Sequence, residues 1–430
     1  GSMNPTPSPA YAQSLDARDP LAGFRERFVI EDPDLIYLDG NSLGRLPAAT
    51  ADHVNRVIRD EWGNKLIRSW NEGWFDKPHQ LGARLAELIG ARPDEVLVCD
   101  TTCINLFKLT VAALQARPDR KRIVSDELNF PSDLYVFQGA AELLGKGHTL
   151  DLIPSEDSIR ITDQALRETL DEDTALAALT HVAFKSAFKY DMADVTERVH
   201  RTGALMLWDL SHSVGALPLD LNGCGVDLAV GCTYKYLNGG PGSPAFLYVK
   251  RELQDQLTPP IWGWFGTRDP FAFNLNYQPG PGADRFLVST PQILSMAGLE
   301  PALDILRDAG MQNLRAKSIR QSEYLIFLFR EWLEPLGYQL GSPEEAEKRG
   351  SHVSLRHPEA YQISRAMIHP QERETTLRVI PDFRAPDNIR LGLAPLYTRF
   401  SDIHRALGRM RDIAAEGTHL HYRPDQGQVT

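Results

Sequence analysis

An acid and an amine lie 26 positions apart in this chain, each just behind a short apolar run. Asp209 ends the run that begins at Leu205, and Lys235 stands between two tyrosines ahead of a glycine-rich turn. Either residue alone is ambiguous, since an aspartate at a strand end commonly caps a turn and most lysines are solvated. Both runs have the pattern of buried strands, and in a parallel sheet such strands end at one edge, where ligands bind. We therefore expect Asp209 and Lys235 to share a site.

The chemistry that suits such a pair is that of pyridoxal phosphate. Its aldehyde requires an amine with which it can form an imine, and its ring nitrogen stays protonated beside an anion. A buried carboxylate is costly without a positive partner, and the protonated ring supplies one to Asp209. Burial is expected to lower the pKa of Lys235, so that it serves first as the imine-forming amine and then as a base.

Three further segments could complete this site. His212, three residues beyond Asp209, is expected to reach the ring hydroxyl or the phosphate, although a histidine that makes one hydrogen bond at a helix end has the same signature. Thr101 and Thr102 lie between a predicted strand and a predicted helix, where hydroxyl and N–H groups bind phosphate or simply cap the helix. Phe130 follows another predicted strand and either covers the cofactor ring or belongs to the core.

The apolar pattern predicts an α/β fold in which strands alternate with helices. Seven strands are expected, at residues 96–99, 122–125, 149–153, 178–184, 205–208, 228–231 and 245–249. Helical spacing lies between several of them, at residues 103–115, 132–144, 163–170 and 192–202. This alternation is typical of a mostly parallel sheet flanked by helices.

The pattern changes after Pro291, which predicts a second, smaller α+β domain. Long helices are expected at residues 299–309 and 314–334, and strands at 351–356 and 389–393. The expected division is a tag scar and loose N-terminus at 1–20, an N-terminal segment packing with the small domain at 21–46, a large cofactor domain at 47–291 and a small domain at 292–430. The connecting loop at 259–291 is expected to be ordered, and the tail beyond Gly417 mobile.

Composition argues against several classes of function. The 430 residues include 46 Lys and Arg against 57 Asp and Glu, a formal charge of −11, so no basic field attracts nucleic acid or anionic lipid. No apolar run reaches the roughly 18 residues that a membrane-spanning helix needs. Four cysteines without a CxxC pair argue against a disulfide scaffold and a zinc cluster, and a reducing cytoplasm suits them best. We expect no metal site.

Ser42 suggests a different enzyme class. Residues 40–44, Gly-Asn-Ser-Leu-Gly, match the GxSxG elbow of serine hydrolases and follow a predicted strand. In that elbow the helix starts directly after the serine, whereas Pro47 is the expected first helical residue here. A serine hydrolase is therefore the less favoured alternative, and Ser42 is expected in a turn or in substrate binding.

Taken together, the motifs resemble the fold-type I pyridoxal phosphate enzymes, in the branch that includes the cysteine desulfurases. The segments that carry this resemblance are 209–212, 233–237 and 239–242. Within that branch the chain resembles the kynureninases, through residues 40–44, 105–106, 130–133 and 389–397. The resemblance extends from about Asp39 to Phe400. It implies the pyridoxal phosphate-dependent transferase-like fold and a homodimer with active sites at the subunit interface. It also implies hydrolysis of L-kynurenine to anthranilate and L-alanine, in tryptophan degradation.

The resemblance further implies roles for individual residues. Lys235 is expected to hold the cofactor covalently, Asp209 to pair with the ring nitrogen and Phe130 to stack on the ring. The other cofactor contacts that it implies are Thr101, Thr102, Asp133, Thr180, His212 and Tyr234, with Trp264 and Thr290 reaching the phosphate from the connecting loop of the other subunit. Substrate contacts are expected from Ser42, Trp70 and Arg390, and Arg390 is expected to grip the α-carboxylate. Tyr234 is our hypothesis for the proton donor to the β-carbon.

Two positions bear on the substrate. Animal members carry Tyr-Gly-His near residues 69–71, where this chain has Ser-Trp-Asn, and an asparagine in place of Thr290. Both differences resemble bacterial members and favour kynurenine over 3-hydroxykynurenine. The main alternative within the fold, a cysteine desulfurase-like lyase, requires a nucleophilic cysteine in the second domain, and each of the four cysteines lies at or before Cys232. A non-catalytic binding protein would not keep the lysine together with the phosphate-binding residues.

Overall fold

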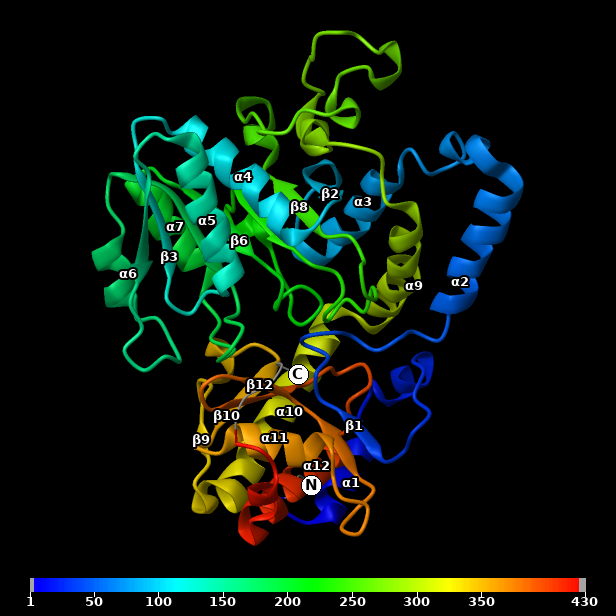
Figure 1. Cartoon of the computed structure of the whole chain (residues 1–430), viewed down its shortest axis with the longest axis vertical. Coiled ribbons are helices and arrows are strands. Elements are labelled where there is room, and N and C mark those ends of the chain that lie inside the picture. The colour runs from blue at the N-terminus through cyan, green and yellow to red at the C-terminus, as the bar shows by residue number, and fades with distance from the viewer. Residues whose placement is uncertain (1–3, 425–430) are drawn as a thin grey trace.

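The computed structural model describes residues 4–424 and arranges them as two bodies (Figure 1). The upper body contains a seven-stranded sheet, and the lower body contains a four-stranded sheet. The N-terminal segment lies in the lower body, beside the C-terminal segment. Within the described residues, no helix combines the length and the apolar character needed to cross a membrane.

The large sheet contains the seven predicted strands. They are β2 (Val96–Val98), β3 (Arg122–Asp126), β4 (Thr149–Ile153), β5 (Thr174–Thr180), β6 (Leu205–Asp209), β7 (Leu228–Gly231) and β8 (Phe246–Val249). Their order is β2-β8-β7-β6-β5-β3-β4, and within this sheet β8 runs antiparallel to both of its neighbours. The predicted position of β5, at residues 178–184, was wrong by four residues. The apolar run continues beyond the strand, so its pattern does not mark where the chain leaves the sheet.

The side chains of alternate residues of β6 pack on opposite faces of the sheet. Leu205 and Leu207 pack into the core formed with α4 (Thr102–Ala116) and α5 (Pro131–Leu144). Met206 and Trp208 pack into the opposite core with α7 (Met192–Thr202). The other helices of this body are α2 (Thr50–Arg56), α3 (Lys77–Ile89), α6 (Asp163–Thr169), α8 (Leu221–Cys224) and α9 (Ile293–Ala309). Because helices cover both faces, polar side chains that act together must gather at the strand ends.

The lower body is an antiparallel sheet packed with helices. Its strands, in spatial order, are β12 (Asp382–Arg384), β13 (Asn388–Gly392), β10 (His352–Arg356) and β9 (Gln339–Leu340). Its helices are α10 (Met311–Leu328), which continues into a π-helical turn at Phe329–Leu333, α11 (Ala360–Ile368) and α12 (Phe400–Glu416). A separate parallel pair joins β1 (Leu35–Tyr37) to β11 (Arg378–Ile380). The predicted strands at 351–356 and 389–393 are confirmed to within one residue.

The segments near both chain ends are more structured than predicted. Instead of a loose N-terminus, α1 (Pro9–Ala17) forms, and Asp16 accepts hydrogen bonds from the backbone N–H groups of Phe400 (2.7 Å) and Ser401 (3.1 Å). Asp16 thus caps α12, a polar contact between distant segments that no apolar pattern reveals. Beyond Gly417, a short 3-10 helix at Thr418–His421 buries two of its residues, so the tail is ordered there. Residues 1–3 and 425–430 of the predicted scar and tail lie outside the described residues.

The helix expected to start at Pro47 starts at Thr50 instead. Pro47 forms a β-bridge with Phe28, and the N–H of Ala48 donates a hydrogen bond to the Arg27 carbonyl (2.8 Å). These contacts hold residues 47 and 48 against the N-terminal segment, so the helix cannot begin before them.

The connecting loop at 259–291 is ordered, as predicted. It contains three short 3-10 helices, at Trp264–Gly266, Pro270–Ala272 and Gly282–Phe286. The loop protrudes at the top of the molecule (Figure 1). We refer to it below as the protruding loop.

Candidate active site

One cavity of about 270 Å³ collects most of the predicted site residues. It lies at the carboxyl ends of β5 and β6, and β12 and β13 of the lower body contribute to its wall. Ten of the fourteen predicted residues line it: Ser42, Thr102, Phe130, Asp133, Thr180, Asp209, His212, Tyr234, Lys235 and Arg390. We refer to it below as the cofactor cavity.

The lysine and the aspartate meet because β6 and β7 are neighbours in the sheet. Asp209, the last residue of β6, pairs in register with Val230 of β7, so the loops that follow both strands open at one edge. The buried Asp209 carboxylate accepts a hydrogen bond from the Ser211 N–H (2.9 Å). Lys235 follows β7, and its Nζ lies 4.9 Å from the centre of the Tyr234 ring. The expected amine and carboxylate therefore line the same cavity.

The pKa of the Lys235 amine is shifted in the direction opposite to the one expected. Burial acts to lower the pKa of its amine, but Cys232, Tyr234 and Asp209 act in the opposite direction and outweigh burial, so the pKa is raised. The predicted lowering was wrong in direction. The reason is that Cys232, then Tyr234 and Asp209, lie near the amine and together compensate for the loss of water.

A second carboxyl group lies beside Asp209. Asp133, in the first turn of α5, is buried, and burial followed by the charge of Asp209 raises its pKa well above the ordinary value. These two causes favour the protonated form of Asp133, and Thr180 Oγ1 lies 3.5 Å from its Oδ2. A protonated pyridine ring would give the buried Asp209 carboxylate a positive partner.

His212 offers a polar atom without a partner. Its side chain is 6% exposed and its Nε2 has no hydrogen-bond partner among the described residues. Burial, then the charges of Lys235 and His352, lowers its pKa well below the ordinary value, so the ring is neutral. A buried ring nitrogen at the cavity wall without a partner fits an oxygen of a bound cofactor.

The phosphate end of the predicted site is at the start of α4. Thr101 is the N-cap residue, and its Oγ1 accepts a hydrogen bond from the Ile104 N–H (3.4 Å). Thr102, the first helical residue, lines the cavity, whereas Thr101 does not. The N–H groups in the first turn of α4 can bind an anion whether or not the Thr101 hydroxyl contributes.

Phe130 is placed to cover a flat ring. It stands just before α5, is 43% exposed, and lies edge-on against Phe184 with 5.2 Å between ring centres. Phe130 lines the cavity and is partly exposed, so part of its ring is open to a bound group. This arrangement suits stacking on a pyridine ring.

Arg390 lies at the opposite end of the cavity, on β13. Its side chain is buried, Nη1 donates to the Phe184 carbonyl (2.6 Å), and Nη2 donates to Ser42 Oγ (3.0 Å) and to Asp382. The guanidinium is thus held in one orientation at the cavity wall, as binding of a carboxylate requires.

The hydrogen-bond partners of the Ser42 hydroxyl are not those of a hydrolase nucleophile. Its hydroxyl donates to Asp382 Oδ2 (2.6 Å), and no histidine is among its partners. The glycines of the motif have a packing role instead. A Cβ on Gly44 would lie 2.5 Å from the Lys235 carbonyl oxygen, so a glycine lets this turn lie against the lysine loop. The serine hydrolase alternative is wrong.

Comparison with known proteins agrees with this geometry. A sequence model described as the kynureninase C-terminal domain matches residues 314–410. A kynureninase from Burkholderia mallei (strain SAVP1) is 46% identical over 407 residues, covering 94% of this chain and 94% of the relative. The chain belongs to the kynureninase family. A second relative, the kynureninase from Pseudomonas fluorescens, is 44% identical over 405 residues, covering 93% of this chain and 94% of the relative.

Membership in the kynureninase family confirms the predicted family, enzymatic activity and pyridoxal phosphate cofactor. The fold is confirmed by solved structures. The apo structure of the cysteine desulfurase from Thermococcus onnurineus NA1 superimposes with a TM-score of 0.77 at 16% identity, covering 97% of this chain and 100% of that one. That likeness concerns the fold alone, so the alternative of a desulfurase is overruled by the kynureninase relatives.

Four of the predicted residues lie outside the cofactor cavity of this chain. Besides Thr101, they are Trp70, Trp264 and Thr290. Trp70 contacts Trp74 and Phe265, with 5.5 and 6.4 Å between ring centres. Trp264 is 4.5 Å from Phe265 in the protruding loop, and Thr290 is exposed. The resemblance implies that Trp264 and Thr290 act at the site of the other subunit, and that implication stays a prediction.

Five residues that line the cofactor cavity were missed: Cys103, Ser132, Phe184, Ser211 and Arg384. Three of them adjoin predicted residues, so proximity in sequence was a usable signal. Phe184 reaches the cavity from the loop after β5, and Arg384 from β12, a strand of three residues in a segment rich in Pro and Asp. Neither carries a local pattern that indicates a site.

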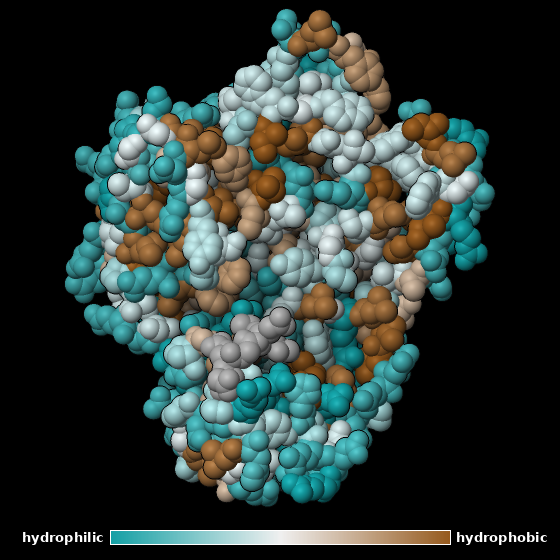
Figure 2. Space-filling view, viewed as in Figure 1, coloured by the Kyte–Doolittle hydropathy of each residue, from teal (hydrophilic) through white to brown (hydrophobic). Residues whose placement is uncertain are grey.

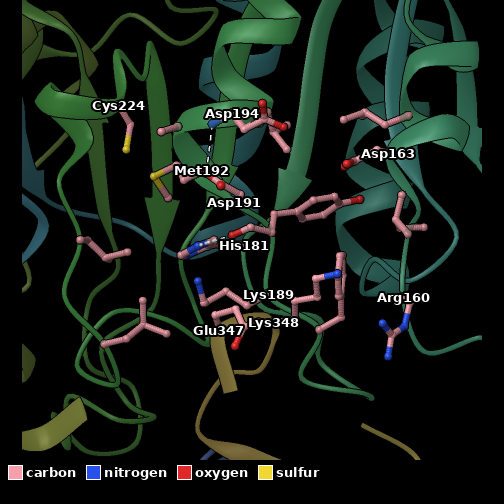
Figure 3. A pocket seen from close by; sticks show the side chains of 18 of the residues that line it. Arg160, Asp163, His181, Lys189, Asp191, Met192, Asp194, Cys224, Glu347 and Lys348 are labelled. Atoms are coloured by element: carbon pink, nitrogen blue, oxygen red, sulfur yellow. Dashed lines mark hydrogen bonds between the residues drawn. The ribbon is translucent and has the colours of Figure 1, made fainter. Parts of the chain in front are cut away.

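A second and larger cavity, of about 760 Å³, is lined by residues of the segment after β5 and of the first turn of α7 (Figure 3). His181, which follows Thr180, faces it together with Lys189, Asp191 and Lys348. None of the fourteen predicted residues lines this cavity, so the smaller one is the candidate active site in the kynureninase family fold. Across residues 4–424 there is no group of three or more His, Cys, Asp or Glu side chains suited to a metal ion.

Proposed function

We propose that this chain hydrolyses the bond between the β and γ carbons of L-kynurenine, giving anthranilate and L-alanine, with pyridoxal phosphate in the cofactor cavity. The observation that carries the proposal is the convergence of Lys235, Asp209 and Arg390 on one cavity. An amine, a ring-nitrogen partner and a carboxylate clamp are what an amino acid substrate of this cofactor requires. Family membership across 94% of the chain supports the activity.

The cofactor has a residue for each of its functional groups. Lys235 holds the aldehyde, Asp209 faces the ring nitrogen and Phe130 covers the ring. The other contacts are Thr102 with the α4 N-terminus at the phosphate, His212 through Nε2, Asp133 and Thr180. When bound, the cofactor supplies a protonated ring that accepts electrons from the reacting carbon.

The proton transfers are assigned to two neighbouring residues. Lys235 removes the α proton of the substrate, and Tyr234 returns a proton to the β carbon. Burial raises the pKa of Tyr234, which keeps its hydroxyl protonated and able to donate. Arg390 meanwhile fixes the α-carboxylate, and water adds to the γ-ketone before anthranilate leaves.

We expect Tyr234→Phe to bind the cofactor normally and to lose turnover. The phenyl ring preserves the contact with Lys235 while removing the only acidic proton of the side chain, so kcat is expected to fall on the order of 100-fold. The loss is to be measured as kcat for anthranilate release, and cofactor content by visible absorbance. Tyr236→Phe is the matched control, since Tyr236 is buried outside the cavity. An unchanged kcat in Tyr234→Phe would remove this residue from the mechanism.

The activity itself is tested by the fluorescence of anthranilate after L-kynurenine is added to the protein loaded with pyridoxal phosphate. A parallel assay with 3-hydroxykynurenine, which follows 3-hydroxyanthranilate as the product, tests the preference for kynurenine that Trp70 and Thr290 favour. Formation of alanine from L-cysteine, with sulfide released only after a thiol reductant is added, and no anthranilate from kynurenine, would contradict the proposed activity.

A homodimer with shared active sites is part of the proposal. The protruding loop and the segment after α2 expose large apolar side chains, which Figure 2 shows as brown areas at the top and upper right. They include Ile67, Trp262, Phe271, Phe273 and Leu275. A monomer rarely exposes so many large apolar side chains. Their burial between two subunits would bring Trp264, Thr290 and Trp70 toward the cofactor cavity of the partner.

The dimer is expected to have twice the mass of one chain in light scattering. Leu275→Asp is expected to weaken it, because Leu275 is fully exposed and a charge there stays solvated only in the free subunit. Leu143→Asp, at an exposed position of α5, is the control and is expected to remain dimeric. A monomer with full activity would refute the shared site. We further propose cytoplasmic location, which the four free cysteines favour. We also propose a two-domain division between residues 291 and 292, although α9, which follows it, packs into the core of the upper body.

A further inference from the structure

Four charged side chains meet at the Arg390 end of the cofactor cavity. Asp382 and Arg384 come from β12, Arg390 from β13, and Asp39 from the turn after β1. The register of the sheet places Asp382 opposite Arg390, and both are buried. Because two carboxyl groups and two guanidinium groups are buried close together, their protonation states are coupled.

Asp382 connects the members of this group. Its Oδ2 accepts hydrogen bonds from Ser42 Oγ (2.6 Å), from Arg384 Nη2 (3.3 Å) and from Arg390 Nη2. The Phe184 carbonyl holds the other terminal nitrogen of Arg390 at 2.6 Å. The guanidinium is therefore fixed at both ends, with Asp382 on one side and a carbonyl on the other.

Asp39 is the acid without a counter-charge of its own. It is 9% exposed, and its Oδ1 has no hydrogen-bond partner among the described residues. Burial, then the neighbouring charge of Asp382, raises its pKa to about 8, although Ser42 and Arg390 oppose the shift. At neutral pH the side chain is therefore mainly a neutral acid.

The groups that face Asp39 come from each neighbouring element: Tyr37, Asp382, Arg384, Arg390 and Tyr397. Burial raises the pKa of both tyrosines, so they stay neutral through the alkaline range. The arginines stay charged, and Asp382 stays ionised because Arg390 and Arg384 overcome its burial and lower its pKa. Within this group, Asp39 alone changes charge between pH 7 and pH 9.5.

The charge of the group decides how well it attracts a substrate carboxylate. With Asp39 neutral, two arginines face one carboxylate and one positive charge remains. With Asp39 ionised, the charges cancel, and a second carboxylate entering the cavity gains no net attraction. We propose that Asp382 and Asp39 are positioning residues for the substrate carboxylate: Asp382 orients Arg390, and Asp39 stays protonated so that the group keeps one positive charge. This inference rests on the proposed function and assigns the control of substrate binding at that site.

The test uses two ligands that differ in charge alone. The first is 4-oxo-4-phenylbutanoate, which has a kynurenine-like ketone and one carboxylate but no amino group; the second is its primary amide. Calorimetric titration of the holoenzyme at pH 7 and pH 9.5 is expected to show at least about a tenfold rise in Kd for the acid and little change for the amide. The amide removes contributions from any group that does not act through the carboxylate.

Asp39→Asn is the decisive variant, because asparagine keeps the shape of the neutral acid. Its Kd for the acid is expected to equal that of wild type at pH 7 and to remain there at pH 9.5. With L-kynurenine, the alkaline rise in KM is expected to disappear while kcat keeps its pH profile. A rise that persists in Asp39→Asn would overturn the assignment and would indicate another acid, with Asp133→Asn as the comparison.

Asp382→Asn separates orientation from charge. Without the charge of Asp382, Asp39 ionises at lower pH, so the alkaline step in Kd is expected to vanish while binding at pH 7 weakens at least about tenfold from the loss of orientation. A normal Kd at pH 7 in this variant would overturn the positioning role. If L-kynurenine is not cleaved by wild type, the proposed function fails; if it is cleaved but the acid binds no better than the amide at pH 7, this inference alone fails.

Thermal unfolding gives a readout independent of ligand. The raised pKa means that folded Asp39 holds a proton that the unfolded chain releases above about pH 4, so its contribution to stability is lost as pH rises from about 4 to 8. The difference in Tm between Asp39→Asn and wild type is expected to grow over that range and to level off above it. A constant difference would contradict a buried, protonated Asp39.

Discussion

Lys235→Ala is expected to abolish covalent attachment of pyridoxal phosphate and to reduce the release of anthranilate by at least about 1,000-fold. Lys235 lines the cofactor cavity and is the only lysine among its lining residues, so no second amine can replace it. Borohydride reduction followed by peptide mapping is expected to mark Lys235 in the wild-type protein and no residue in the variant. The remaining contacts, at the phosphate end and around the ring, still allow reversible binding of the cofactor.

The matched control is Lys146→Ala, in the exposed segment after α5, which is expected to keep both cofactor and turnover. Added methylamine offers a rescue test, because it supplies the missing amine without restoring the side chain. Turnover in Lys235→Ala close to that of wild type, or a borohydride adduct at another lysine, would overturn the assignment of the site.

The sequence was sufficient to predict the sheet and the central pair of site residues for a physical reason. Strands β6 and β7 are buried on both faces, so each is a continuous apolar run that ends at polar residues. The end of such a run locates the site edge, which is why Asp209 and Lys235 could be paired from their positions along the chain. Where the apolar run is longer than the strand, as at β5, the run does not show at which residue the strand begins or ends.

The parts that could not be predicted depend on contacts between distant segments. Asp382 and Arg384 become a strand only by pairing with β13, and their local sequence has no strand pattern. Asp16 caps a helix that begins 384 positions later, which requires the fold to be complete. The pKa of Lys235 was predicted in the wrong direction because burial was considered without the neighbouring Cys232, Tyr234 and Asp209, which raise it.

A comparable limit applies to Trp70, Trp264 and Thr290. The family resemblance names them as site residues, but within one chain they lie outside the cofactor cavity. Their setting beside exposed apolar side chains is consistent with action across a subunit interface, which a single chain cannot complete. Whether these three residues act at the site of the partner subunit is decided by the dimer experiment and not by further variants of residues in the cofactor cavity.

Asp209→Asn is expected to lower kcat on the order of 100-fold to 1,000-fold while Lys235 still holds the cofactor. Asparagine keeps the hydrogen bond from the Ser211 N–H, but it removes the negative charge that stabilises a protonated ring nitrogen. The fold is expected to survive, because the substitution removes a buried charge and preserves the shape. The measurements are kcat for anthranilate release and cofactor retention after dialysis.

Asp133→Asn is the informative comparison, since Asp133 is a buried carboxyl in the same cavity whose pKa is raised well above the ordinary value, which favours its protonated form. Replacing a protonated acid by an amide changes no charge, so the loss of kcat is expected to be at least about tenfold smaller than in Asp209→Asn. Equal losses in the two variants would mean that the negative charge is shared between them, and a larger loss in Asp133→Asn would place it on Asp133. Either outcome would reverse the assignment of the ring-nitrogen partner, even though both residues lie in one cavity and have one carboxyl group each.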